Sequence, residues 1–436
     1  MSDQPRPRRP GLALVAAGLI TLPGVLTRLM GVHPDDWLAA LCFGFGIVGA
    51  AFLLSWGAEV VQLDISAGLA LAVLALIAVL PEYAVDFVFT AKAGTNPEEF
   101  APLALANMTG ANQLLIGVGW SMVVLLAAYR IKRATALREA DPSLPPVVLE
   151  PGCSPDEVVL SRPHSVEIAF LLLATLYGLT LPFKRTISLF DAAVLVTIFV
   201  LYLVRVARAP AEEPHLVGPA LYIGSLPVKQ RRMAVAGLFI AAAAVILLCA
   251  EPFAEALVST GEEFGISTFL LVKWLAPLAS EAPELLIAGM FAWRLNTNAG
   301  LGTLVSSKVN QWTLLVGTLP IVFAISSKSF HGLPLDGLQR EELFVTAAQS
   351  AFAIAILASR SISVREARLL LGLFIAQFIT TGALPGDWRD EARIICGIVY
   401  LLLAAWQIYQ ERRQVPELLR DGLRRPYSEI VRNRHG

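Results

Sequence analysis

The sequence is poor in the residues that build disulfide frameworks, zinc sites and metal-dependent active sites. Its four cysteines are far apart and form no CxxC pair, so neither a disulfide framework nor a zinc site is expected. The five histidines all fall in predicted loops or in the C-terminal tail. An intramembrane enzyme would need an HExxH motif, or a nucleophile and a base within the apolar segments. The predicted spans contain no histidine, so enzymatic chemistry is disfavoured.

Charged residues are also scarce. Only 16% of the residues are charged and 56% are hydrophobic, with many apolar runs long enough to cross a bilayer. The net charge of −1 gives no indication of a nucleic-acid partner. We expect the lipid bilayer to be the partner, and the sequence leaves the oligomeric state open. The first apolar run is not followed by a small-residue cleavage site, so we expect it to be retained as a span.

We predict an all-α integral membrane protein with about 12 transmembrane helices. When the N-terminus is placed inside, most of the 34 Lys and Arg residues fall in inner segments. Both termini are therefore expected to be cytoplasmic in a multi-pass protein of the bacterial-type inner (cell) membrane. The expected spans are 12–29, 37–61, 66–91, 101–129, 166–183, 188–207, 233–257, 267–293, 299–325, 342–359, 367–384 and 391–409.

Two Pro-Glu pairs lie within these apolar spans. Pro81-Glu82 is in the third span, and Pro283-Glu284 is in the eighth. A carboxylate at the centre of a span costs roughly 2.5–3.5 kcal/mol on insertion scales, so it is a functional-site hypothesis by default. Each Pro-Glu pair is followed by an Asn-Gln pair, Asn112-Gln113 in the first half and Asn310-Gln311 in the second. A glycine follows each Asn-Gln pair at the same distance, Gly119 and Gly317.

These matched motifs indicate two halves of five spans each. Because five is an odd number, the second half would cross the membrane in the opposite sense, as in the inverted repeats of secondary transporters. Two of the connecting segments, 134–165 and 208–232, are rich in proline and are predicted to be cytoplasmic linkers. The predicted domains are the N-terminus with an extra span (1–36), the first repeat (37–207), a linker (208–232), the second repeat (233–384), and the last span with a basic cytoplasmic tail (385–436).

The helix after each Pro-Glu pair carries small polar residues. Superposing the two halves on Asn-Gln places Thr109 on Ser307 and Gln113 on Gln311. Each hydroxyl precedes its amide by four residues, so both lie on one helical face. Carboxylate, hydroxyl and amide oxygens are hard ligands, of which Ca²⁺ prefers about 6–8. The sequence therefore indicates a cation site whose metal charge is balanced by Glu82 and Glu284.

With this pattern the chain resembles the calcium/cation antiporter superfamily, of the sodium/calcium exchanger type. The resemblance covers most of the chain in topology and the stretches 78–119 and 279–317 in motif. It implies transported Ca²⁺ and Na⁺ or H⁺, with no cofactor. A competing register would instead place Asn107 and Asn112 on the family's two earlier asparagines. The resemblance implies these cation-binding residues: Glu82, Glu284, Ser280, Thr109, Gln113, Ser307 and Gln311, with Glu82 and Glu284 as the metal-binding carboxylates. Further candidates are Glu281, Lys308, Asn112, Asn310 and Asp86.

The chain departs from the family pattern in ways that bear on the coupling ion. The Thr-Ser before Pro-Glu is Ala78-Val79 in the first half and Ser280-Glu281 in the second. The resemblance implies that hydroxyls of this kind line sodium sites, so sodium coupling is put in question. Lys308 stands where the first half has Gly110. We hypothesise that Lys308 or Lys273 pairs with Glu281 or a site glutamate and stands in for a bound monovalent cation.

The expected function is secondary-active antiport of Ca²⁺ against Na⁺ or H⁺, by alternating access at a midplane site built by the two Pro-Glu helices. One alternative is a proton/monovalent-cation antiporter that is not specific for calcium. Another is a degenerate homologue that does not exchange ions. A twelve-span facilitator of organic solutes is disfavoured, because the short Gln62-Leu63-Asp64-Ile65 loop does not fit the basic loop motif of that class.

Overall fold

The computed structural model describes residues 10–61, 63–64, 80–141, 149, 152–209, 216, 218–383 and 386–432. These residues are almost entirely helical, and ten of the described helices are long and apolar enough to cross a membrane. The predicted all-α membrane fold is therefore confirmed. Residues 66–79 of the third predicted span lie outside the described residues. The chain forms two compact units, unit 1 (Met1–Phe89 and Val206–Pro283) and unit 2 (Thr90–Arg205 and Glu284–Gly436).

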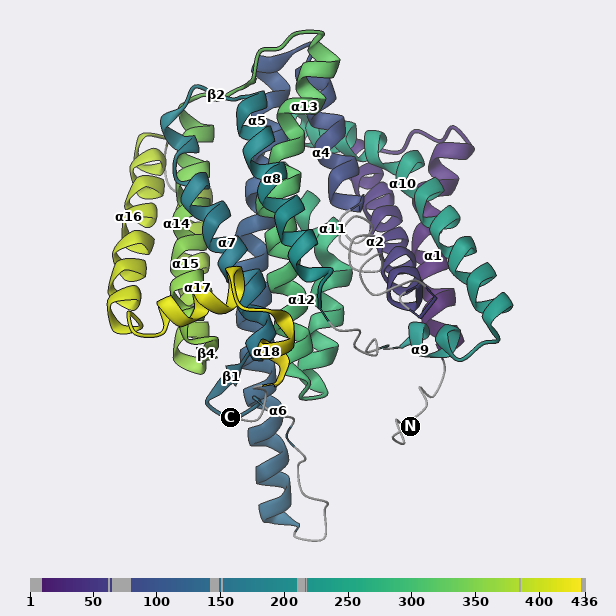
Figure 1. Cartoon of the computed structure of the whole chain (residues 1–436). Helices are drawn as coiled ribbons and strands as arrows, with labels where there is room; N and C mark the ends of the chain where they lie inside the picture. Colours follow the sequence, from purple (N-terminus) through teal and green to yellow (C-terminus); the bar gives the residue numbers. More distant parts are fainter. Residues whose placement is uncertain are drawn as a thin grey trace. The chain divides into compact units, whose positions relative to one another are not determined.

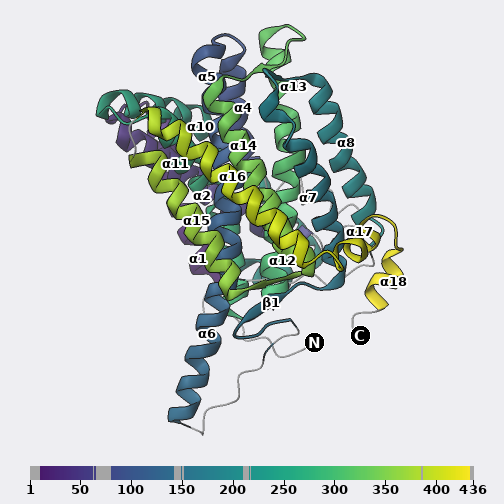
Figure 2. The same cartoon turned by 90° about the vertical axis from the view of Figure 1, so that its left-hand side faces the viewer.

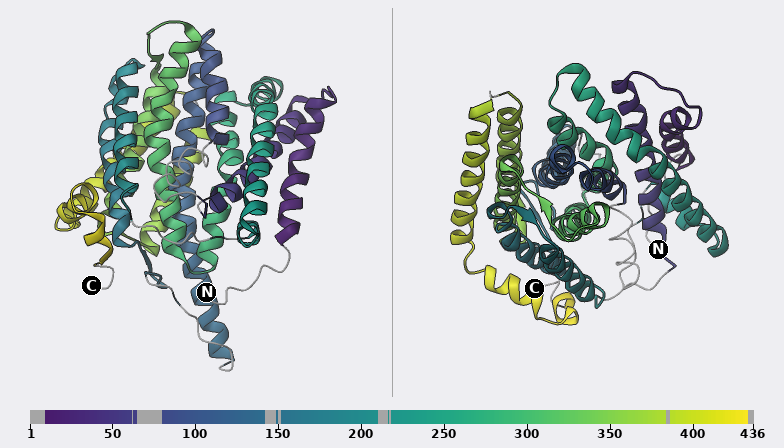
Figure 3. Two further views of the ribbon diagram at one scale, coloured as in Figure 1. Left: turned by 45° about the vertical axis from the view of Figure 1, so that its right-hand side comes forward. Right: turned by 90° about the horizontal axis from the view of Figure 1, so that it is seen from above.

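Unit 1 is built around three long helices that lie side by side, α1, α2 and α10 (Figure 3). Glycines let their backbones approach closely. A Cβ atom on Gly46 of α2 would lie 2.8 Å from the Cys249 sulfur of α10, and one on Gly49 would lie 2.6 Å from Thr21 of α1. The helices of this unit are α1 (Pro10–Leu29), α2 (Asp36–Val61), α9 (Pro219–Gly224), α10 (Val228–Phe264), and the first parts of α4 (Leu80–Ala93) and α11 (Thr268–Trp293).

An ion pair in unit 1 joins the turn after α2 to the start of α10. Arg231 donates hydrogen bonds from two guanidinium nitrogens to the two carboxylate oxygens of Asp64, each over 2.8 Å. Arg232 donates a third bond to the same carboxylate over 3.1 Å. The hydrogen bond from Arg231 holds the pKa of Asp64 below its usual 3.8.

We expect unit 1 to lose the stability that this ion pair contributes when the pH falls. Because the folded pKa of Asp64 is depressed, its contribution is fully present above the unfolded-state pKa and is lost as the pH falls through the folded pKa. Arg231→Gln should therefore lower the Tm of the detergent-solubilised protein at pH 7, and the difference from wild type should shrink toward zero once Asp64 is protonated. Arg232→Gln is the matched control, because the Arg232 side chain is 63% exposed and that of Arg231 only 14%. Equal Tm shifts for the two variants at pH 7 would contradict the assignment.

Unit 2 contains the remaining helices and two small antiparallel sheets, and Figures 1 and 2 show its helices from two sides. In one sheet β1 pairs with β4, and in the other β2 pairs with β3. The helices are α5 (Pro97–Leu114), α6 (Ser121–Ala140), α7 (Ser165–Gly178), α8 (Leu189–Val206), α12 (Thr297–Asn310), α13 (Val316–Ser327), α14 (Gly337–Ile356), α15 (Val364–Ala383), α16 (Gly386–Gln410), α17 (Val415–Leu423) and α18 (Tyr427–Arg432). The strands are β1 (Glu157–Val159), β2 (Thr186–Ile187), β3 (Leu333–Pro334) and β4 (Ser361–Ser363), and the short helices are η1 (Leu115–Trp120), η2 (Arg162–His164), η3 (Leu181–Phe183), η4 (Gln311–Leu315) and η5 (Leu357–Ser359).

The helices match the predicted spans but often run beyond them. Helix α10 begins at Val228 and ends at Phe264, well outside the predicted 233–257. The helix formed by α5, η1 and α6 continues to Ala140, into the segment 134–165 that was predicted to be a loop. Within the same segment, residues Glu157–Val159 form β1 and pair with β4. The prediction of a solvated linker over 134–165 is therefore wrong at both ends, because helix and strand hydrogen bonds extend into it.

The C-terminal tail of unit 2 is folded back onto the unit, because its helix α17 packs against α7 (Figure 2). The sequence analysis predicted a basic cytoplasmic tail after the last span. The structure buries an acidic residue of this tail, Asp421 of α17, and surrounds it with arginines. Arg162 and Arg425 each donate to its carboxylate over 2.6 Å, and Arg360 lies 3.8 Å away. Part of the basic tail is therefore neutralised within the protein.

Candidate functional site

Helices α5 and α12 carry most of the predicted polar residues of unit 2, and the two helices are built alike. Pro97 occupies the first turn of α5, where its missing N–H costs nothing. The Asn296 side chain caps α12 by accepting a bond from the Ala299 N–H over 3.2 Å. Each helix then changes to a π-helical turn at the Asn-Gln motif, η1 at Leu115–Trp120 and η4 at Gln311–Leu315. Such π turns are rare and often occur at functional sites.

Glu284 and Ser307 are brought together in unit 2. The Ser307 hydroxyl of α12 donates a hydrogen bond to Glu284 Oε2 of α11 over 2.6 Å. Ser307 is 9% exposed, and Glu284 is partly buried. A carboxylate held by a hydroxyl keeps free lone pairs on both groups. This pair of oxygens can therefore bind a cation.

The predicted residues of unit 1 are deeply buried. Glu82 and Asp86 lie one turn apart on the same face of α4, and they are 1% and 0% exposed. On α11, Ser280 and Glu281 are 6% and 3% exposed. The Ser280 hydroxyl donates to the carbonyls of Ala276 and Pro277 in its own helix, each over 3.3 Å. Its lone pairs stay available because the hydroxyl acts as the donor in both bonds.

Gln113 belongs to a buried polar cluster that the sequence analysis missed. Its amide nitrogen donates to Thr346 Oγ1 over 2.7 Å and to Glu342 Oε2 over 3.3 Å, while its amide oxygen accepts a bond from Gln377 over 2.8 Å. Gln349 donates to the Gln113 backbone carbonyl over 3.4 Å. The structure therefore ties Gln113 of α5 to α14 and α15. A signal was present in the sequence, because Glu342, Thr346 and Gln349 follow helical spacing within an apolar span.

The other predicted residues of α5 and α12 are buried, with different partners. Thr109 donates to the Leu105 carbonyl of its own helix over 2.7 Å. Asn310 and Gln311 are 3% and 0% exposed. Lys308 is fully buried and its ammonium donates to Asn112 of α5, to Oδ1 over 2.6 Å and to the backbone carbonyl over 3.2 Å. Ser307 and Glu284, both predicted for the cation site, are thus hydrogen-bonded to each other, and Lys308 contacts Asn112, a partner that the sequence analysis did not name.

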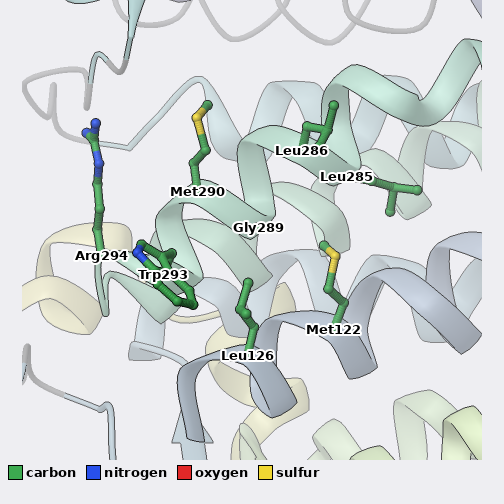
Figure 4. Close-up of a pocket in the computed structure, with 8 residues that line it drawn as sticks. All are labelled: Met122, Leu126, Leu285, Leu286, Gly289, Met290, Trp293 and Arg294. Carbon is green, nitrogen blue, oxygen red and sulfur yellow. The ribbon is translucent and has the colours of Figure 1, made fainter. Parts of the chain in front are cut away.

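Unit 2 also has an apolar pocket between α6 and the end of α11, with a volume of about 480 Å³ (Figure 4). Its eight lining residues include no carboxylate, amide or hydroxyl side chain, so it lacks ligands for a hard cation. Within the described residues no group of three or more His, Cys, Asp or Glu side chains is placed to hold a metal.

Comparison with known proteins identifies the family. The model of the sodium/calcium exchanger protein family matches residues 36–207 and 234–381, which is more than half of the chain. A solved structure of the H⁺/Ca²⁺ exchanger CAX is 39% identical and covers 98% of this chain and 99% of its own, with a TM-score of 0.85. The structure of the Ca²⁺/H⁺ antiporter protein YfkE is 17% identical, covers 91% of this chain and 100% of its own, has a TM-score of 0.57 and supports the fold alone. A comparison with curated proteins gives no significant match. The chain therefore belongs to the sodium/calcium exchanger protein family and is a membrane transporter of cations rather than an enzyme.

Proposed function

We propose that this protein exchanges Ca²⁺ for H⁺ across the membrane. The observation that carries the proposal is the likeness to the H⁺/Ca²⁺ exchanger CAX over nearly the full length of both chains. The sequence also favours H⁺ over Na⁺ as the coupling ion. The hydroxyl pair that the resemblance implies for sodium sites is replaced by Ala78-Val79 in the first half and by Ser280-Glu281 in the second.

Glu82 and Glu284 are the carboxylates that bind the transported ions in this proposal. Ser307 supports it, because its hydroxyl orients Glu284 and keeps oxygen lone pairs for a cation. Ser280, Thr109 and Gln311 supply further oxygens. Gln113 takes a supporting role, because its amide oxygen already accepts a bond from Gln377.

Exchange then follows from competition for the same carboxylates. Protons that bind Glu82 and Glu284 remove the negative charge that holds Ca²⁺, and Ca²⁺ binding displaces protons. Each ion is thereby carried only when the other has left. Alternating access of the carboxylates to the two sides of the membrane converts this competition into antiport, as in other transporters built from inverted repeats.

Flux into proteoliposomes tests the proposal. Vesicles containing the purified full chain are loaded with acidic buffer, with Na⁺, or with neither, and Ca²⁺ uptake is followed in each. We expect uptake with the outward H⁺ gradient, abolished by a protonophore, and none with the outward Na⁺ gradient. Uptake driven only by Na⁺ would identify a sodium/calcium exchanger. Na⁺/H⁺ exchange without Ca²⁺ flux would identify the monovalent-cation alternative, and no flux of either kind would identify a non-exchanging homologue.

A further inference from the structure

Lys308 is an ammonium group that unit 2 buries completely within a membrane-spanning helix. It has 0% exposed surface and lies on α12 directly after Ser307, which binds Glu284. Moving an ammonium from water into an apolar interior is costly unless oxygen ligands replace its hydration shell. The environment of Lys308 therefore has to act as a cation site.

The groups around the ammonium are those of a monovalent-cation site. Asn112 provides its side-chain oxygen at 2.6 Å and its backbone carbonyl at 3.2 Å. The Lys308 nitrogen also lies 4.8 Å from the centre of the Trp312 ring, whose negative face attracts cations. These three groups are neutral, and each of them can stabilise a single positive charge.

The site is built to present oxygen toward Lys308. The Asn112 amide nitrogen donates to the Met108 carbonyl over 2.8 Å, and this bond fixes the amide so that its oxygen faces the ammonium. Asn112 also stands directly before Gln113, which α14 and α15 hold through three side chains. The oxygens of Asn112 are therefore held in place by bonds that do not involve Lys308.

The two halves of the chain differ at this position. Lys308 corresponds to Gly110 when Gln113 is aligned with Gln311, so the first half has no side chain where the second has an ammonium. A tethered cation is therefore present at only one of the two aligned positions. The ammonium of Lys308 contacts an asparagine of the first half, Asn112, through two oxygens.

We infer that the Lys308 ammonium permanently occupies a position that would otherwise take a free monovalent cation, such as Na⁺, on the oxygens of Asn112. This inference rests on the proposed function and deepens it, because it assigns the independence from Na⁺ to one residue. The fixed charge replaces an ion that would have to bind and leave in each cycle. The carboxylates are then left to exchange Ca²⁺ for H⁺ alone.

Replacing Lys308 by methionine tests the inference, because methionine keeps an unbranched side chain and removes the charge. We expect H⁺-driven Ca²⁺ uptake by Lys308→Met to fall at least about tenfold in Na⁺-free buffer and to recover when equal Na⁺ is present on both sides. Wild type should show no response to Na⁺. The Tm of Lys308→Met, but not of wild type, should rise on addition of NaCl relative to choline chloride.

Two further variants make the test specific. Lys308→Arg retains the charge and should stay independent of Na⁺. Lys273→Met removes the other buried lysine, whose nitrogen lies 4.6 Å from the Trp274 ring, and should create no Na⁺ dependence.

Three results for Lys308→Met would overturn the inference. The variant could transport at the wild-type rate without Na⁺, or it could fold but not be rescued by Na⁺. It could also fail to fold both with and without Na⁺. Failure of the proposed function is distinct, because wild type itself would then show no H⁺-driven uptake.

Discussion

Glu284→Gln is expected to reduce H⁺-driven Ca²⁺ uptake by at least about 100-fold, and Glu82→Gln to do the same. Glutamine keeps the size and the oxygen but removes the negative charge that holds a divalent cation. Removing one partner of a hydrogen-bonded charge pair costs roughly 3 kcal/mol, which corresponds to about 100-fold in binding. For Glu284, glutamine can still accept the bond from Ser307, so the fold around the site should be kept.

The measurement is initial Ca²⁺ uptake in proteoliposomes with matched amounts of reconstituted protein. Glu341→Gln is the control, since Glu341 is an acid of a spanning helix that pairs with Arg393 and has no place in the proposed site. Its flux should stay within about threefold of wild type. Glu284→Asp keeps the charge at a shorter reach and should fall between wild type and Glu284→Gln. Wild-type rates for both glutamine variants would remove Glu82 and Glu284 from the transport site.

Asp421→Asn is expected to release the C-terminal tail from unit 2. The Asp421 carboxylate is fully buried and neutralises the guanidinium groups of Arg162, Arg360 and Arg425. Removing its charge leaves three arginines without that partner, and breaking a buried pair costs roughly 3–5 kcal/mol. Because these arginines keep 19–25% of their side-chain surface exposed, we expect the lower end of that range.

Limited proteolysis with trypsin measures this release. The tail carries Arg412, Arg413 and Arg420, and cleavage of a docked segment follows the population of its open state. A loss of about 3 kcal/mol corresponds to roughly 100-fold faster cleavage. Glu417→Gln is the matched control, because Glu417 pairs with the same Arg162 but is 52% exposed, and its cleavage rate should change little. Equal cleavage rates for Asp421→Asn and wild type would show that the tail is held by its apolar contacts.

Much of the fold could be predicted because its signals are local. Apolar runs fix the helices, and the distribution of basic residues predicts their direction. The ends of α10 and α6 could not be predicted, because charged helical turns beyond the bilayer have no apolar signal. The docking of the tail could not be predicted either, since an arginine facing lipid and an arginine facing Asp421 look the same in a sequence.

The candidate site could also be predicted only in part from the sequence. The register of the two halves predicted Ser307 as a residue of the cation site, and the spacing placed Thr109 and Gln113 on one face. Which partner each residue takes depends on helices far away in the sequence. Gln113 shows this most clearly, because α14 and α15 supply the groups that use its amide. The π turns η1 and η4 also follow from packing between helices and have no motif of their own.

The helix from Pro97 to Ala140 has a practical consequence for experiments. At 1.5 Å per residue its 44 residues reach about 66 Å, roughly twice the hydrocarbon thickness of a bilayer, so its last turns stand in water as a rigid rod. The four native cysteines are buried or half-buried. A single cysteine placed at the exposed Leu137 would therefore react with a maleimide from one side of the membrane only, and the reactive side would establish the orientation of the whole chain.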